Sequence, residues 1–142
     1  MSTETLISHS PEETQALAAR IVAGLPGRAV LALHGDLGSG KTCFVQGVAR
    51  ALGIRRAITS PTFTIINEYA GARRLHHIDL YRLPGPDDAL HLGFEDYMHA
   101  EGLTVVEWAE RAGDLVPPDA VHLHFEALPD PTERRIRIQY PE

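Results

Sequence analysis

One short segment of the chain has the residue types and spacing of a loop that binds phosphate. It reads HGDLGSGKT over residues 34–42, and residues 35–42 satisfy the pattern G-x-x-x-x-G-K-[ST] in full. Its glycines allow the backbone to turn several N–H groups toward one anion, and a helix starting here would present its positive N-terminus to the same phosphates. Lys41 is expected to bridge the β- and γ-phosphates, and the Thr42 hydroxyl to bind Mg²⁺. The segment therefore predicts a nucleoside triphosphate site.

The lysine of this loop is the only lysine in the sequence, because every other basic residue except histidine is an arginine. A slim ammonium fits between phosphate groups where a planar guanidinium fits poorly. The single use of lysine at this position favours the same interpretation of the loop.

Two acidic residues follow apolar segments of strand length. Asp79 comes after LHHI, and Glu107 comes after the more apolar LTVV. Nucleotide-binding loops of this kind are usually faced by a carboxylate at the end of a neighbouring strand. We expect Glu107 to be the carboxylate on the Mg²⁺ side and Asp79 to orient or deprotonate the attacking water. On pattern alone, each could also be a surface acid at the end of a strand.

A second loop, TSPT over residues 59–62, offers hydroxyl groups between two elements. Such a loop can become ordered when a hydroxyl reaches the γ-phosphate or the metal. A plain proline-containing loop explains the same residues equally well.

The elements that would position these residues follow the order of an α/β domain. Ser10, Pro11 and Glu13 predict a helix start with a cap, a proline in the first turn and a capping box. The apolar run AVLALH predicts a strand over residues 29–34 that is covered on both faces, and residues 42–52 have helical spacing. The glycine loop thus lies between a buried strand and a helix.

The remaining segments predict strands, two short helices and a final antiparallel pair. The strands are expected near Leu6 and Ile7 and over residues 62–69, 75–79, 103–108, 120–127 and 134–140. One short helix is expected to follow the break at residues 84–88 and to run through Leu92, and another is expected near residues 94–99. We expect one domain over residues 1–142, with the three-layer sandwich of P-loop NTPases. Its sheet is expected to be mostly parallel, with the C-terminal antiparallel hairpin at one edge.

Composition limits the partners of the chain. Its formal net charge is −6 over 142 residues, which makes it a poor stand-alone binder of tRNA or DNA. The sequence has neither an apolar run of membrane-spanning length nor a secretory signal, and a single cysteine, Cys43, fits a reducing compartment, so we expect a cytoplasmic protein without a membrane partner. His76 and His77 would point to opposite faces of a strand, and His122 and His124 lack a third ligand at suitable spacing, which disfavours zinc.

Four blocks together resemble the TsaE family, formerly YjeE, along nearly the whole chain. They are GDLGSGKT (35–42), SPTFT (60–64), HIDLYRL (77–83) and VVEW (105–108), and LGFEDY (92–97) is similar as well. The resemblance implies an ATPase that uses ATP and Mg²⁺ and acts with TsaB and TsaD. Those partners place a threonylcarbamoyl group on N6 of adenosine 37 in ANN-decoding tRNAs. ATP hydrolysis is then expected to reset the complex, and tRNA is met only through that complex.

The resemblance also implies roles for individual residues. Thr42 and Glu107 would hold Mg²⁺, Asp79 would lie near the γ-phosphate, and Lys41 would act in catalysis. Cys43 stands where the family often has Thr, so its backbone N–H rather than its side chain would serve the α-phosphate. The nucleotide contacts implied are those of Ser10, Asp36, Leu37, Gly38, Ser39, Gly40, Lys41, Thr42, Cys43, Thr62 in the switch-like loop, Trp108 and Arg134.

Three other functions stay open. A small-molecule kinase, transferring phosphate to an acceptor, would need an acceptor pocket and an arginine-bearing lid, for which the pairs Arg55-Arg56 and Arg73-Arg74 could supply charge. The sequence has no evident acceptor-binding insertion. A GTPase is disfavoured because its usual N-K-x-D reader needs a second lysine. A binding module whose ATP only orders an interface would be hard to separate from a slow ATPase.

Overall fold

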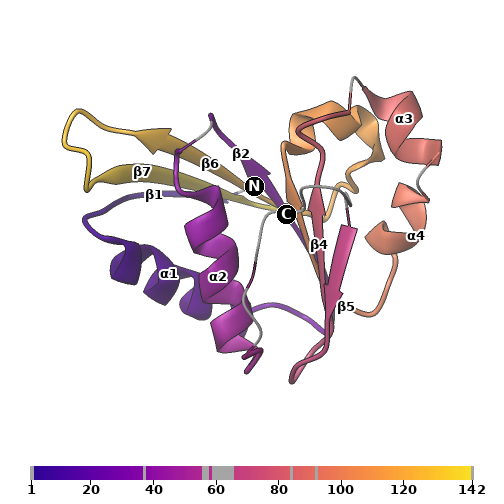
Figure 1. Cartoon of the computed structure of the whole chain (residues 1–142), viewed down its shortest axis with the longest axis horizontal. Coiled ribbons are helices and arrows are strands. Elements are labelled where there is room, and N and C mark those ends of the chain that lie inside the picture. Colours follow the sequence, from indigo (N-terminus) through magenta and orange to yellow (C-terminus); the bar gives the residue numbers. More distant parts are fainter. Residues whose placement is uncertain are drawn as a thin grey trace.

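A computed structural model describes residues 2–36, 38–55, 58, 66–83, 85–91 and 93–141 of the chain. In this part of the chain, seven strands form one mixed sheet in the order β1-β7-β6-β2-β5-β4-β3. Helices pack on the sheet (Figure 1). The predicted α/β class is confirmed.

The strands and helices have the following bounds. The strands are β1 (Ser2–Ser8), β2 (Arg28–His34), β3 (Ile66–Tyr69), β4 (Leu75–Asp79), β5 (Gly102–Glu107), β6 (Val121–Ala127) and β7 (Arg134–Tyr140). The α-helices are α1 (Pro11–Ala23), α2 (Lys41–Ala51), α3 (Pro86–His91) and α4 (Phe94–Met98), and a 3₁₀ segment, η1, covers Ala109–Leu115. Within the described residues, no helix is long and apolar enough to cross a membrane.

The sheet is mixed rather than mostly parallel, which corrects the expectation from the sequence. The pairings β2–β5, β2–β6 and β4–β5 are parallel, whereas β1–β7, β6–β7 and β3–β4 are antiparallel. The last two strands do not form the edge, because β1 pairs with β7 from Ser2 to Ser8. This first strand is longer than the residues around Leu6 predict. Its polar N-terminal half is ordered by pairing with a distant strand, and such a partner leaves no local signal.

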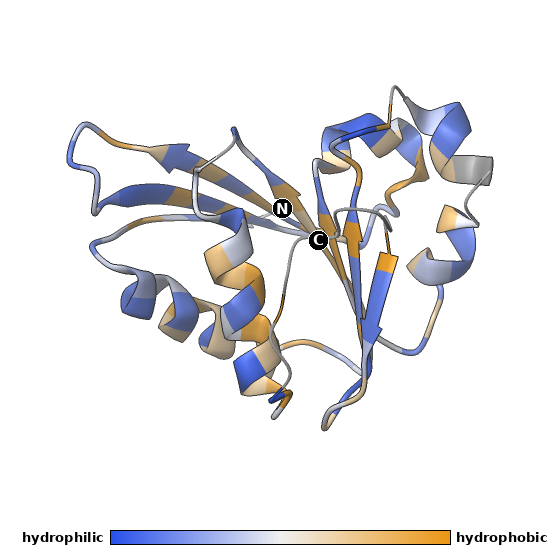
Figure 2. Cartoon of the chain, viewed as in Figure 1, coloured by the Kyte–Doolittle hydropathy of each residue, from blue (hydrophilic) through white to orange (hydrophobic). Residues whose placement is uncertain are grey.

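Helices cover the sheet on two sides, and each side has its own apolar cluster. Helices α1 and α2 lie on one side, and α3, α4 and η1 lie on the other (Figure 1). Alternate residues of β2 serve the two clusters: Leu31 and Leu33 join the first, and Val30 and Ala32 the second. Figure 2 shows hydrophobic residues concentrated along the central strands. The continuous apolar run of this strand is therefore explained by burial on both faces.

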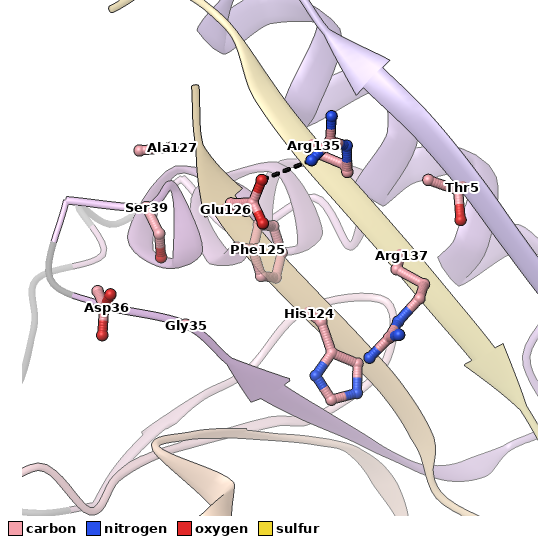
Figure 3. A pocket seen from close by; sticks show the side chains of 10 residues that line it. All are labelled: Thr5, Gly35, Asp36, Ser39, His124, Phe125, Glu126, Ala127, Arg135 and Arg137. Carbon is pink, nitrogen blue, oxygen red and sulfur yellow. Dashed lines mark hydrogen bonds and ion pairs between the residues drawn. The ribbon is translucent and has the colours of Figure 1, made fainter. Parts of the chain in front are cut away.

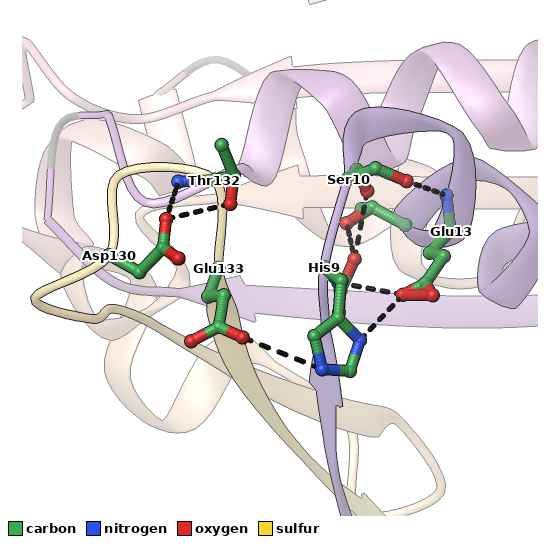
Figure 4. A network of polar contacts seen from close by, with 8 residues as sticks. His9, Ser10, Glu13, Asp130, Thr132 and Glu133 are labelled. Carbon is green, nitrogen blue, oxygen red and sulfur yellow. Dashed lines mark hydrogen bonds and ion pairs between the residues drawn. The ribbon is translucent and has the colours of Figure 1, made fainter.

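The start of α1 is held by the predicted cap, with one difference in its partners. The Ser10 side chain accepts a hydrogen bond from the Glu13 N–H at 3.1 Å, and Pro11 occupies the first turn. The Glu13 carboxylate, however, accepts from the N–H of His9 at 2.7 Å rather than from that of the cap residue (Figure 4). The same oxygen also lies 3.0 Å from Nδ1 of His9, and Nε2 of this ring lies 3.5 Å from Glu133. The Glu13 carboxylate thus contacts both the backbone and the ring of His9. Through Glu133, His9 also connects the start of α1 to the turn before β7.

We expect Ser10→Ala to lower the free energy of unfolding by about 1 kcal/mol, because it leaves the Glu13 N–H without its capping acceptor. Ser10→Asp is the matched control, since aspartate is an equally good cap, and it should keep the stability of the unmodified chain. Urea denaturation followed by circular dichroism measures both. Equal stability of the alanine variant and the unmodified chain would contradict a role of this cap in stability.

Candidate functional site

The glycine loop connects the C-terminal end of β2 to the first turn of α2. Gly35 has φ +142° and Gly40 has φ +107°, both in the region that favours glycine. A Cβ on Gly35 would lie 2.6 Å from the carbonyl oxygen of Phe125 in β6, so a side chain would displace the loop from the neighbouring strand. Gly40 is the N-terminal cap of α2 and has no side chain to satisfy the first N–H groups of this helix. The N-terminus of a helix is a place where backbone N–H groups can bind an anionic ligand.

Lys41 is the first residue of α2 and is almost entirely buried, at 5% exposure. Its Nζ donates a hydrogen bond to the carbonyl oxygen of Gly35 and lies 3.7 Å from the centre of the Trp108 ring. Burial lowers the pKa of Lys41, and the charge of Glu107 acts in the opposite direction. The ammonium is therefore held beneath the loop, in a place where an anionic ligand would stabilise its charge.

The two carboxylates of the sequence prediction lie side by side. Asp79 ends β4 and Glu107 ends β5, and the two residues are register partners on these parallel strands. Glu107 is buried and Asp79 is half-buried. Burial raises the pKa of Asp79, and the negative charge of Glu107 raises it further. A hydrogen bond from the Tyr81 N–H to Oδ1 of Asp79, at 3.0 Å, acts in the opposite direction. Two acidic groups so close together suit a bound cation.

His77 is a member of this group that the sequence analysis did not assign. Its Nε2 lies 2.6 Å from Oε2 of Glu107, and both side chains are buried. His77 and Asp79 are two residues apart on one strand, so they lie on the same face of the sheet. The alternation along β4 could have placed this histidine beside the carboxylates, but its partner on β5 depends on the order of the strands.

Trp108 turns the chain away from β5 directly after Glu107. Its φ of +57° makes it the one non-glycine residue with positive φ in the described part of the chain. Its ring lies 5.0 Å from that of Tyr81 and 5.3 Å from the guanidinium carbon of Arg111, in addition to the contact with Lys41. The structure thus places the predicted tryptophan against the lysine of the loop. Sequence analysis missed Arg111, which has no motif around it. The positive φ of Trp108 is a backbone strain of a type often found at functional sites.

The N-termini of α1 and α2 and the end of the last loop lie close to one another. The Cys43 sulfur donates to the carbonyl oxygen of Pro11 at 3.5 Å, so this thiol faces α1. The Arg134 side chain lies near Gly40, since a Cβ built on that glycine would be 3.6 Å from Cγ of the arginine. Ser10 caps α1 next to Pro11. Cys43, Arg134 and Ser10, which are expected to contact the α-phosphate or the base, therefore all lie near the first turn of α2.

The groups around the loop fit a nucleotide and Mg²⁺. Ser39 Oγ is buried and has no hydrogen-bond partner among the described residues. Thr42 and Glu107 offer a hydroxyl and a carboxylate, and oxygen ligands of this kind are those that Mg²⁺ prefers. Asp36 and Gly38 lie in the loop itself. Two predicted residues, Leu37 and Thr62, lie outside the described residues, as does the rest of the SPTFT block.

A pocket of about 560 Å³ with both polar and apolar walls lies beside the start of the loop (Figure 3). It is lined by Gly35, Asp36 and Ser39 and by side chains of β6, β7 and β1. Arg135 forms an ion pair with Glu126 in this pocket at 2.6 Å. Of the predicted nucleotide contacts, the pocket includes only Asp36 and Ser39, so it is separate from the group around Lys41.

Three histidines stack behind the loop. His34, the last residue of β2, lies 3.1 Å from Glu110 through Nδ1 and 2.9 Å from Nδ1 of His122 through Nε2. Its ring stacks on that of His124 with 4.5 Å between the centroids. Burial lowers the pKa of both His34 and His122. Within the part of the chain that the structure describes, no three His, Cys, Asp or Glu side chains are arranged to hold a metal ion.

Comparison with known proteins gives one consistent family. The model of the family described as threonylcarbamoyl adenosine biosynthesis protein TsaE matches residues 8–136. Proteins named tRNA threonylcarbamoyladenosine biosynthesis protein TsaE are similar: that of Bacillus subtilis is 42% identical, covering 89% of this chain and 79% of its own length. That of Aquifex aeolicus is 41% identical, with 94% and 93% covered.

A solved structure agrees with the sequence matches. The crystal structure of YdiB from Bacillus subtilis superposes with a TM-score of 0.83 at 35% identity, covering 99% of this chain and 87% of that one. The part of this chain that the family model matches includes the glycine loop, β4 and β5. The family model, the relatives and the fold lead to one conclusion: this chain belongs to the TsaE family.

Proposed function

We propose that the chain is a cytoplasmic, Mg²⁺-dependent ATPase with the three-layer fold of P-loop NTPases. It acts with TsaB and TsaD in the threonylcarbamoylation of adenosine 37 in ANN-decoding tRNAs. One observation carries the ATPase proposal: the glycine loop with Lys41 meets the carboxylate pair Asp79 and Glu107 at the carboxyl ends of neighbouring strands. The family's description as a threonylcarbamoyl adenosine biosynthesis protein supports the biological role.

In this proposal, the N–H groups of residues 36–43 bind the phosphates and Lys41 bridges the β- and γ-phosphates. Thr42 and Glu107 hold Mg²⁺, which when bound neutralises phosphate charge. Asp79 orients the attacking water and accepts its proton. Burial and the charge of Glu107, which both raise the pKa of this carboxyl, make it a better base than an exposed aspartate.

Further contacts to the phosphates and the base are proposed for side chains that surround the loop. Trp108 flanks the phosphates through its contact with Lys41, and Arg134 lies beside Gly40, where it can reach phosphate or base. Ser10 is proposed to approach the adenine from the start of α1. Thr62, in the SPTFT loop, is proposed to contact the γ-phosphate through its hydroxyl.

The partners follow from the family and from charge. A chain with a net charge of −6 is repelled by the phosphates of an isolated tRNA, so it meets tRNA only through TsaB and TsaD. ATP binding and hydrolysis would then change the state of that complex between rounds of modification. We expect turnover by the chain alone to be slow and to change when TsaB and TsaD are present.

A small-molecule kinase is the second candidate. The pocket of Figure 3 borders the start of the loop, but it is separate from the group around Lys41, so it does not offer an acceptor site next to the transferred phosphate. In a kinase, phosphate would pass to an acceptor, whereas the proposed ATPase releases inorganic phosphate. The family's role in threonylcarbamoyl adenosine biosynthesis favours the ATPase.

Lys41→Ala should lower ATP affinity roughly tenfold to hundredfold, because hydrogen bonds to a charged group contribute about 1.5–3 kcal/mol. Arg50→Ala is the matched control, since Arg50 is an exposed cation on the same helix. Isothermal titration calorimetry measures both, and ATP should bind more tightly than GTP. An unchanged ATP affinity after loss of the lysine would refute the assignment of the loop, and equal affinity for GTP would contradict the proposal of an ATP-specific enzyme.

Glu107→Ala separates the metal from the phosphates. We expect it to keep ATP affinity in EDTA and to lose most Mg²⁺-dependent hydrolysis, measured as phosphate release. Normal hydrolysis by this variant would transfer the role of metal ligand to Asp79.

Addition of TsaB and TsaD should change the rate of phosphate release, because the proposed task of hydrolysis is to alter their complex. The control is Lys41→Ala with the same partners, which should remain inactive. A rate that does not respond to TsaB and TsaD would contradict the partner role and favour the kinase.

A further inference from the structure

The contact between His77 and Glu107 is one of the most buried polar contacts in the described residues. Nε2 and Oε2 are 2.6 Å apart, and the two side chains are 0% and 4% exposed. Because a carboxylate only accepts, Nε2 carries the proton and donates it. A short hydrogen bond to a charged acceptor in a place without water is strong, and it fixes the direction of the carboxylate.

The register of the strands explains why this histidine reaches this carboxylate. His77 is opposite Val105 and Asp79 is opposite Glu107, so the histidine lies two residues before the acidic pair along the strands. Residues two apart on a strand share a face, and their side chains reach diagonal neighbours on the next strand. The bond engages Oε2 of the glutamate and leaves Oε1 for another ligand.

Stability alone does not account for an imidazole at this position. Its other nitrogen, Nδ1, is buried and has no hydrogen-bond partner among the described residues. An unpaired buried polar atom costs free energy, whereas an apolar side chain would suit the neighbours Leu75 and Val105. The hydrogen bond to Glu107 is therefore what the histidine contributes.

The adjacent residue gives a comparison within the same strand. His76 is also buried, and its Nδ1 likewise has no hydrogen-bond partner among the described residues, although it lies 3.0 Å from Glu68. Its ring packs edge-on against Tyr97, on the opposite face. It makes no contact with the acidic pair in the described residues. The two neighbouring histidines thus differ in their relation to Glu107 and resemble each other in burial.

We propose that His77 is a positioning residue, which holds Glu107 in the orientation needed to bind Mg²⁺. The proposal rests on the Mg²⁺-dependent ATPase proposed above. Hydrogen-bond partners of metal ligands commonly fix ligand orientation in this way. His77 touches neither metal nor nucleotide in this account and acts only through the glutamate.

His77→Leu tests the proposal, because it removes the N–H donor and keeps an apolar side chain in the strand. The measurement is ATP affinity by calorimetry, once in EDTA and again over a range of Mg²⁺ concentrations. We expect an unchanged affinity in EDTA and a loss of roughly 10–100-fold in the Mg²⁺ affinity of the ATP complex. Half-maximal hydrolysis should require correspondingly more Mg²⁺.

Three further variants make the result specific. His77→Gln carries an amide N–H at the position of Nε2 and should restore Mg²⁺ affinity, whereas the shorter His77→Asn should not. His76→Leu loses a buried histidine of the other face and should retain the Mg²⁺ affinity of the unmodified chain. If the leucine variant does not fold in thermal unfolding, the glutamine and asparagine pair decides.

Two results would overturn the inference while leaving the ATPase intact. One is unmodified Mg²⁺ affinity in His77→Leu or His77→Asn. The other is an equal loss of ATP affinity with EDTA and with Mg²⁺, which would reveal a purely structural histidine. If the unmodified chain binds ATP with no dependence on Mg²⁺, the proposed function fails, and the inference fails with it.

Discussion

The parallel register of β2, β5 and β4 is the constraint on which the whole site depends. It pairs Leu33 with Glu107 and Glu107 with Asp79, so three strands end at one edge of the sheet. Parallel strands present their carboxyl ends together, and in open α/β sheets ligands bind outside those ends. The glycine loop leaves β2 at this edge and returns as α2, which brings Lys41 over the acidic pair. A shift of one strand by a single residue would turn its carboxylate to the other face.

Burial of charge is the second feature of the site. Lys41 and Glu107 are almost completely removed from water, and Asp79 is half-buried. Burial raises the pKa of Asp79, and the charge of Glu107 adds to this rise; a divalent cation would offset both effects. Each carboxylate has a hydrogen-bond partner in the protein. His77 donates to Glu107, and the Tyr81 N–H donates to Asp79. The geometry is thus set before any ligand binds, which reduces the cost of binding.

Local signals in the sequence account for much of this arrangement. The pattern of residues 35–42 identifies the loop, and the apolar run before Glu107 predicts a strand, because burial on both faces favours apolar residues throughout. The strand before Asp79 carries a weaker signal, since LHHI has two histidines. The start of α1 at Ser10 follows from a cap that involves only neighbouring residues. These features were predictable because their causes lie within a few positions of one another.

Other features depend on which segments become neighbours in space. The pairing of β1 with β7, the mixed sheet and the His77–Glu107 bond all join residues distant in the sequence. The alternation of β4 places His77 on the face of Asp79, but only the strand order shows that β5 lies beside it. The contact of Arg111 with Trp108 likewise follows from a turn whose backbone has positive φ.

The most direct test of the central claim is a crystal structure of the chain with Mg²⁺ and a non-hydrolysable ATP analogue. The account predicts the β- and γ-phosphates on the N–H groups of the loop, the Lys41 ammonium between them, and Mg²⁺ bound by Thr42 and Glu107. A nucleotide bound away from the loop, or a metal held by Asp79 without Glu107, would contradict it.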